Sequence, residues 1–214
     1  MENVLYTTGD NRPSVWSHTG DRIEAFAKRN NAEVVTLPPN EYTAWWVLFD
    51  AMVDSIEHGK PSTWLDDDII VGKHAESTWK YGSRIMVCEP ASPHRVHPRW
   101  AKVFQKQGVP NRRPYPTTGV VAWRPNQKIK RLANWFKAGL RSGKFNTSWG
   151  DQELLALAVW ELDLPFHYFP TELHGTRVLR TGRPYQMFHA GGPSNKPKRL
   201  ARLKRKMELV ESSA

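Results

Sequence analysis

Three consecutive acids stand between two apolar runs in one short segment, Trp64-Leu65-Asp66-Asp67-Asp68-Ile69-Ile70-Val71. The apolar runs predict two strands joined by an acidic loop. Three like charges held together in a half-buried loop are costly unless a cation offsets them. Asp66 and Asp68 are two residues apart, so in an extended segment their side chains face the same way. Two carboxylates on one side of a strand end suit Mg²⁺ or Mn²⁺ that phosphate oxygens also hold.

The acidic loop has two other interpretations. The first is a solvated turn or a helix cap, against which the flanking apolar strands argue. The second is a phosphatase-type nucleophile loop. Such loops usually follow the first strand and need a Thr or Ser shortly after the acids. Neither condition is met here, because predicted strands precede the loop and apolar residues follow it.

Upstream of the loop, hydrophobic periodicity predicts alternating strands and helices. Strands are expected over residues 2–8 and 32–37, and helices over residues 16–30 and 41–58; residues 63–71 then run strand, acidic loop, strand. This alternation predicts an α/β fold with a largely parallel central sheet and helices on both of its faces. Residues 1–195 are expected to form this single Rossmann-like domain.

Downstream of the loop the pattern is less regular. Further strands are expected over residues 84–88, 119–123, 166–169 and 185–189, and helices over residues 127–141 and 150–162. The first of these helices has basic residues opposite its apolar side, and the second is apolar enough to be buried. The pattern of residues 196–211 predicts a basic helix with Leu200, Leu203 and Met207 on one side. We interpret residues 196–214 as a basic amphipathic tail.

The length and composition of the chain are those of a single-domain protein. Its 214 residues can bury a core without a disulfide, and its one cysteine, Cys88, excludes an internal one. The longest apolar run, residues 44–49, is far shorter than the roughly 20 residues that a membrane-spanning helix needs. The N-terminus lacks the basic-then-apolar pattern of a signal peptide. These features predict a cytoplasmic protein, in the host cytoplasm if the protein is viral.

The charge of the chain is unevenly distributed. The net charge is +10, yet residues 1–89 hold 14 acids against 8 Lys or Arg. Residues 90–150, in contrast, hold 13 Lys or Arg and no acid, and residues 178–206 also contain no acid. Such segregation predicts a polyanionic partner, which could be nucleic acid, an anionic membrane, or both.

Five motifs follow one another along the chain: Tyr6-Thr7-Thr8-Gly9-Asp10-Asn11, Leu65-Asp66-Asp67-Asp68-Ile69, Tyr115-Pro116-Thr117-Thr118-Gly119-Val120-Val121, Trp149-Gly150-Asp151-Gln152-Glu153-Leu154-Leu155 and His189-Ala190-Gly191-Gly192-Pro193-Ser194-Asn195-Lys196-Pro197. This ordered set spans about residues 4–197. It resembles the GT-A fold glycosyltransferases, most closely the retaining glycosyltransferase family 8, which includes the glycogenins and bacterial lipooligosaccharide galactosyltransferases. The sequence departs from that family at Thr117, where the family has Asn, and at Lys198, where it has an aromatic residue.

The resemblance implies transfer of a hexose from a UDP-sugar to a hydroxyl, with retention at the anomeric carbon. It implies that His189 joins Asp66 and Asp68 as a metal ligand, and an imidazole ligand shifts the expected ion from Mg²⁺ toward Mn²⁺. Asp151 and Gln152 are expected beside the sugar as catalytic residues. An amide is a poor nucleophile, so the acceptor would attack from the front face. The residues expected to bind the donor are Thr7, Thr8, Asp10, Asp67, Thr118, Gly119, Gly191 and Lys196.

The charge gives information on the acceptor, which the resemblance does not specify. The acid-free region combines residues that suit phosphate contacts and base stacking: Arg95, Arg99, Trp100, Arg112 and Arg113. The leading hypothesis is DNA carrying a hydroxymethylated pyrimidine such as 5-hydroxymethylcytosine, as in bacteriophage DNA hypermodification, with the base flipped into the pocket. One alternative is a glycolipid or lipopolysaccharide acceptor, with the basic tail on an anionic membrane. The other is a non-catalytic nucleic-acid-binding module.

Overall fold

The two strands that flank the acidic loop belong to different sheets in the computed structural model of the protein. β3 (Ser62–Leu65) lies inside a six-stranded sheet, whereas β4 (Ile69–Val71) is part of a three-stranded one. The loop therefore joins a strand of the large sheet directly to a strand of the small one. The structure describes residues 1–39, 46–81, 85–88, 105, 116–145, 150–170, 173–175, 186–190 and 196–212.

The large sheet has the strand order β2-β1-β3-β6-β5-β7. Its other strands are β1 (Asn3–Thr7), β2 (Ala32–Thr36), β5 (Ile85–Cys88), β6 (Thr117–Trp123) and β7 (Phe166–Tyr168). β1 pairs in parallel with β2 and β3, and β5 pairs in parallel with β7. β6 is the exception, because it runs antiparallel to both of its neighbours, β3 and β5. The predicted mostly parallel sheet is thus confirmed, with one reversed strand at its centre.

The small sheet has the order β4-β9-β8, with β8 (His174–Gly175) and β9 (Met187–His189). β4 and β9 are antiparallel, and their register places Ile69 opposite His189. This pairing brings the end of the acidic loop beside a histidine that lies far away in the sequence.

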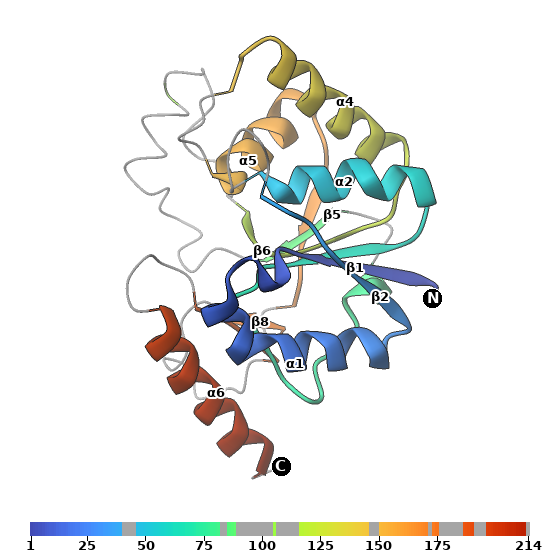
Figure 1. The fold of residues 1–214 in the computed structure, drawn as a ribbon. Coiled ribbons are helices and arrows are strands. Elements are labelled where there is room, and N and C mark those ends of the chain that lie inside the picture. Colours follow the sequence, from blue (N-terminus) through green and yellow to red (C-terminus); the bar gives the residue numbers. More distant parts are fainter. Residues whose placement is uncertain are drawn as a thin grey trace.

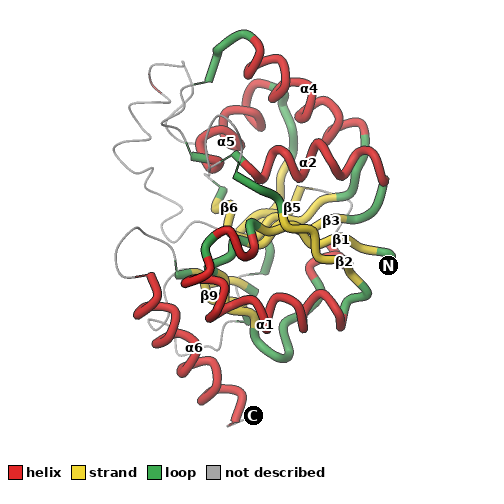
Figure 2. Tube along the Cα trace, viewed as in Figure 1, coloured by secondary structure: helices red, strands yellow, loops and turns green. Residues whose placement is uncertain are grey.

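Helices cover both faces of the large sheet, as predicted (Figure 1). On one face lie α2 (Val47–His58), α4 (Gln127–Arg141) and α5 (Asp151–Glu161); α1 (Pro13–Arg29) lies on the other, and α6 (Lys196–Ser212) runs beside α1. Two 3₁₀ turns, η1 (Gly9–Asn11) and η2 (Thr78–Tyr81), complete the elements described. Figure 2 shows the strands of the large sheet as a layer between the helices, with β9 of the small sheet apart from it. Residues 41–45 of the predicted second helix lie outside the described residues.

Local sequence signals explain several helix ends. Pro13 opens α1, where its missing N–H costs nothing. The side chain of Asn126 caps α4 by accepting hydrogen bonds from the backbone N–H groups of Lys128 and Ile129. Gly59 ends α2 in a left-handed conformation that favours glycine.

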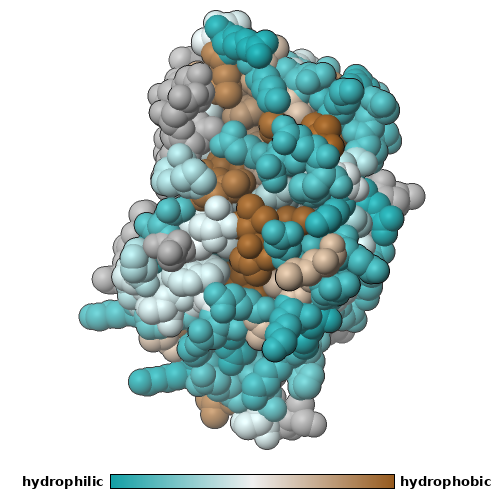
Figure 3. Space-filling view, turned by 45° about the vertical axis from the view of Figure 1, so that its right-hand side comes forward, coloured by the Kyte–Doolittle hydropathy of each residue, from teal (hydrophilic) through white to brown (hydrophobic). Residues whose placement is uncertain are grey.

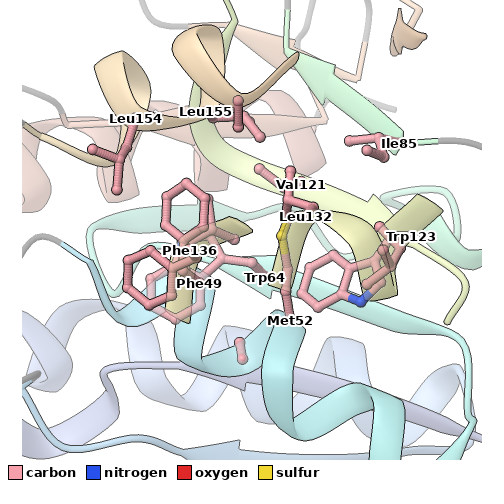
Figure 4. Close-up of a cluster of buried hydrophobic side chains, with 14 of the residues drawn as sticks. Phe49, Met52, Trp64, Ile85, Val121, Trp123, Leu132, Phe136, Leu154 and Leu155 are labelled. Atoms are coloured by element: carbon pink, nitrogen blue, oxygen red, sulfur yellow. The ribbon is translucent and has the colours of Figure 1, made fainter. Parts of the chain in front are cut away.

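An aromatic cluster fills the space between the large sheet and the helices α2, α4 and α5 (Figure 4). The rings of Phe49 and Phe136 stack with their centroids 4.8 Å apart, and Trp46 meets Phe136 edge-on. All three rings are buried. Several of the ten tryptophans are therefore core residues.

The last helix also contributes to a core. Leu200, Leu203 and Met207, the apolar side predicted for this helix, are buried against Val15 of α1, Ile70 of β4 and Phe188 of β9. None of the helices in the described part of the chain has the length and apolarity needed to cross a membrane.

We expect Phe136→Ala to lower the free energy of unfolding by about 3–5 kcal/mol, because it removes a fully buried ring and leaves a cavity. Denaturant unfolding would measure the loss. Lys137→Ala, which changes the exposed neighbour on α4, is the control and should stay within about 0.5 kcal/mol of wild type. A loss below about 1 kcal/mol for Phe136→Ala would contradict the packing described.

Candidate active site

The acidic loop is held in place by three parts of the chain. The N–H of Asp66 donates to the carbonyl of Gly119 in β6 (2.9 Å), and the N–H of Ala190 donates to the carbonyl of Asp68 (3.1 Å). The hydroxyl of Thr19 in α1 donates to the carbonyl of Asp67 (2.6 Å). Each acid is thus fixed through its backbone, so the three side chains have defined directions.

Asp66 and Asp68 converge on His189. The Nε2 atom of His189 lies 3.4 Å from Oδ2 of Asp66 and 3.1 Å from Oδ1 of Asp68. Ligand atoms of the three residues all lie within 4.8 Å of one another. The side chains of Asp68 and His189 are 2% and 10% exposed, whereas that of Asp66 is 26% exposed and gives the cluster its opening.

This donor set fits a divalent cation. Two carboxylates and one imidazole are ligands for Mn²⁺ and related ions, and the imidazole makes the set less suited to Mg²⁺. The spacing of the acids predicts Asp66 and Asp68 as ligands, and the family resemblance predicts His189. The structure brings the three residues together.

Gly119 leaves the space that His189 occupies. A Cβ atom at position 119 would lie 2.7 Å from Nδ1 of His189 and 2.9 Å from its Cε1. Such a contact is too short, so only glycine at this position allows the ring to stay where it is. Gly119, which was predicted to bind the donor, is in this structure the surface against which His189 rests.

The cluster is short of positive charge. Burial raises the pKa of Asp66; the charge of His189 lowers it and that of Asp68 raises it, and the net shift is upward. Burial, followed by the charge of Asp66, raises the pKa of Asp151 to about 7. The raised pKa values of these two partly buried carboxyls mean that burial and mutual repulsion disfavour their ionised forms. A divalent cation would supply a compensating charge.

Lys196 and His189 serve Asp68 as positive partners. The Nζ atom of Lys196, the first residue of α6, lies 2.6 Å from Oδ2 of Asp68. Burial opposes the ionisation of Asp68, but the hydrogen bond with His189 and the charges of His189 and Lys196 hold its pKa below the ordinary value.

Asp151 and Gln152 form the beginning of α5. The carboxylate of Asp151 accepts from the N–H of Gln152 (2.9 Å). The N–H of Gly150, which precedes the helix, donates instead to the side chain of Glu153 (2.9 Å). The side chain of Glu153 thus satisfies the N–H group of Gly150 at the start of α5. The side chain of Asp151 is not needed for this cap and can face Asp66 and His189.

A cavity of about 410 Å³ lies in front of the cluster, a size typical of small-molecule sites. It opens where β1 and β3 end, the usual ligand-binding edge of a parallel sheet. Of the thirteen residues predicted to bind the donor or the metal or to act on the sugar, nine line it: Thr8, Asp66, Asp67, Asp68, Thr118, Asp151, Gln152, His189 and Lys196.

The remaining predicted residues are placed differently or not described. Thr7 is buried, and its hydroxyl accepts from the N–H of Gly9 (3.3 Å). Asp10 belongs to η1, next to the lining residue Asn11. The other predicted residues lie outside the described part of the chain: Gly191, Arg95, Arg99, Trp100, Arg112 and Arg113.

Two side chains that bind the carboxylates of the acidic loop were not predicted from the sequence. Arg12 binds the fully buried carboxylate of Asp67 through both Nε and Nη2, with Nε 2.5 Å from Oδ2. The indole N–H of Trp64 donates to Oδ1 of Asp66 (2.8 Å), which leaves Oδ2 toward His189. The alternation of side chains along a strand places Trp64 and Asp66 on one side and could have revealed this pair. Nothing in the sequence links Arg12 to Asp67.

No protein-family model and no curated protein sequence matches the chain. Solved structures do resemble it. A glycosyltransferase involved in glycosylation of the major capsid of PBCV-1 has a TM-score of 0.60 at 12% identity, over 97% of this chain and 98% of that one. The galactosyltransferase LgtC, in complex with donor and acceptor sugar analogs, has a TM-score of 0.55 at 12% identity, over 95% of both chains. Mouse xyloside xylosyltransferase 1 has a TM-score of 0.57 at 11% identity, over 92% of this chain and 98% of that one.

At such low identity the likeness establishes the fold alone. The chain has the GT-A glycosyltransferase fold over nearly its whole length, as the order of its motifs predicts.

We expect Gly119→Ala to weaken Mn²⁺ binding by about 10–100-fold, because the added methyl group displaces the imidazole of His189. Isothermal titration calorimetry with Mn²⁺ measures the affinity directly. Ala138→Ser is the control, since it also adds one atom, at an exposed position of α4 that does not line the cavity. Unchanged Mn²⁺ affinity in a folded Gly119→Ala protein would show that His189 is not a ligand.

Proposed function

We propose that the protein is a metal-dependent glycosyltransferase that transfers a hexose from a UDP-sugar to an acceptor hydroxyl. The observation that carries the proposal is the cluster of Asp66, Asp68 and His189, placed in the wall of a cavity at the ligand-binding edge of a GT-A fold. The fold alone would not be sufficient, because function depends on the site and not on the architecture.

Asp66, Asp68 and His189 would hold the cation, expected to be Mn²⁺ or, less suitably, Mg²⁺. The bound cation would act as a Lewis acid that offsets the negative charge on the departing diphosphate. Trp64 supports this arrangement by holding one oxygen of Asp66. Arg12 neutralises Asp67, so that this third acid does not compete for the cation.

Lys196 is positioned to bind the diphosphate of the donor. Its ammonium group already lies in the cavity beside Asp68, and it is carried by a helix whose other side is packed in the core. A lysine is a point charge that suits phosphate oxygens. Thr8, Asp10 and Thr118 are the candidates for further contacts with the donor.

Asp151 and Gln152 are the candidates for contacts with the transferred sugar. Asp151 would accept hydrogen bonds from sugar hydroxyls, and Gln152 would lie near the anomeric carbon. Since an amide is a poor nucleophile, we propose that the acceptor hydroxyl attacks from the face that the diphosphate leaves, with retention of configuration. The anomeric configuration of the product, read by NMR, tests this point.

For the acceptor we propose DNA that carries a hydroxymethylated pyrimidine. The proposal is supported by the net charge of +10 and by the acid-free residues 90–150, in which Arg95, Arg99, Arg112 and Arg113 suit phosphates. A glycan or lipopolysaccharide is the second candidate, because the related fold of LgtC was solved with an acceptor sugar analog. A nucleic-acid-binding module without transfer activity is the non-enzymatic alternative.

The deciding experiment is mass spectrometry of nucleosides from DNA containing 5-hydroxymethylcytosine, after incubation with the protein, Mn²⁺ and a mixture of UDP-sugars. A nucleoside heavier by one hexose would support both the enzyme class and the acceptor. Hydrolysis of a UDP-sugar without a new nucleoside would keep the enzyme and favour a glycan acceptor. DNA binding without any consumption of donor would favour the non-enzymatic alternative.

We expect Asp68→Asn to reduce UDP-sugar turnover by at least about a thousandfold, since a lost metal site removes several kcal/mol of stabilisation. The amide keeps the size of the side chain and removes the charge. Asp21→Asn on the exposed side of α1 is the control and should retain activity. Full turnover by Asp68→Asn, with metal still required, would contradict the assigned site.

We expect Lys196→Ala to separate two binding steps. Mn²⁺ alone should bind at least as well as to wild type, because Oδ2 of Asp68 loses a competing cation. UDP should bind at least about tenfold more weakly in the presence of Mn²⁺, because a charge-assisted hydrogen bond is lost. Titration of each ligand by calorimetry gives the two affinities. Unchanged UDP affinity would show that Lys196 does not contact the diphosphate.

A further inference from the structure

We propose that the outward side of α6 binds the phosphate backbone of a nucleic-acid acceptor and leads it to the cavity. The surface consists of Lys198, Arg202 and Arg205, here called the outer stripe. The inference rests on the proposed function for the presence of a sugar-accepting nucleic acid, and it adds the surface on which that acceptor lies.

The helix that carries the outer stripe begins at the cavity. Lys196, the first residue of α6, lines the cavity and contacts Asp68, and Lys198 follows two residues later. Arg199 donates from Nη1 to the carbonyl of Ala190 (3.1 Å), next to His189. From this point α6 runs away from the site along α1 (Figure 1). A chain of phosphates lying on α6 would therefore end at the reacting groups.

The inward side of α6 is fully engaged. Leu200, Leu203 and Met207 are buried in the core, and Glu211 forms an ion pair with Arg22 at 2.9 and 3.2 Å. The N–H of Lys73 also donates to Glu211 (2.7 Å). These contacts hold the helix along its length, so the outer stripe is a rigid surface and not a loose tail.

The spacing of the outer stripe suits a row of phosphates. Its residues are separated by four and three positions, so they lie on one side of the helix. At 1.5 Å of rise per residue they span about 10 Å, which is about the length that three nucleotides of one strand occupy along a duplex axis, at 3.4 Å each. All three side chains are exposed, and none forms an ion pair with an acid among the described residues.

The same packing argues against a membrane as the partner. A helix that lies in a membrane interface buries its apolar side among lipids, but here that side belongs to the protein core. In the lower part of the view, where α1 and α6 lie, the visible surface is mostly hydrophilic (Figure 3). Among the described residues the exposed large hydrophobic side chains are Met1 and Leu209. Leu209 follows Arg205 by four positions, so one apolar side chain lies at the far end of this side of α6. The three residues nearer the cavity are all charged, which suits a polyanion.

A second basic surface serves as an internal comparison. Lys130, Lys137 and Arg141 are exposed on one side of α4, which lies at the opposite end of the molecule from α6 (Figure 1). No residue of α4 lines the cavity. The two surfaces therefore have the same charge but differ in their connection to the site.

The test compares two triple variants: Lys198→Gln with Arg202→Gln and Arg205→Gln, and the α4 control Lys130→Gln with Lys137→Gln and Arg141→Gln. Fluorescence anisotropy would measure binding to a duplex containing 5-hydroxymethylcytosine over a series of salt concentrations, without any nucleotide sugar. The outer-stripe variant should lose affinity by roughly two orders of magnitude at 0.1 M salt. Its slope of log K against log salt should become shallower by about 2.7, as expected for three lost phosphate contacts. The control should keep the wild-type slope.

An outer-stripe variant with the wild-type slope would overturn the inference, as would equal losses in both triple variants. Wild-type protein that binds vesicles of phosphatidylserine and phosphatidylcholine but not the duplex, at the same salt, would overturn it in favour of a membrane. Because the assay contains no donor, it separates the two proposals. Loss of duplex binding in the outer-stripe variant, together with no UDP-sugar consumption by wild type, would support the surface and refute the transferase.

Discussion

Repulsion among Asp66, Asp67 and Asp68 is the constraint on which the rest of the structure depends. Each carboxylate has its own partner: the indole of Trp64 for Asp66, Arg12 for Asp67, and His189 with Lys196 for Asp68. Arg12 comes from the N-terminal part of the chain and His189 and Lys196 from its C-terminal part, so distant parts of the sequence must meet at the acidic loop. The small sheet and the docking of α6 are the means by which they meet.

Much of this fold is readable from the sequence because its signals are local. The periodicity of residues 127–141 predicts α4 with the bounds that the structure has, and the apolar runs around the acidic loop predict β3 and β4. The direction of β6 is not readable, because an apolar strand looks the same whether its neighbours are parallel or antiparallel. β8 has only two residues and leaves no pattern at all.

The same difference between local and distant signals decides which parts of the site can be predicted. Asp66 and Asp68 are found from their spacing, because neighbouring side chains of an extended segment have known directions. The pairing of Arg12 with Asp67 and the contact between Gly119 and His189 join residues far apart in the sequence. The helix α6 shows the same limit. Its basic and apolar sides are evident in the sequence, but the surface that covers the apolar side consists of Val15, Ile70 and Phe188 from three other elements.

The register of β4 with β9 has a consequence for the order in which the site appears during synthesis. Asp68 leaves the ribosome about 120 residues before His189 and Lys196. At 5–20 residues per second, the nascent chain spends on the order of 10 s with its acidic loop complete and these two cationic partners not yet made. Arg12 and Trp64 are already present in that interval. Arg12 and Trp64 are therefore available to the acidic loop before the segment that carries His189 and Lys196 has been synthesised.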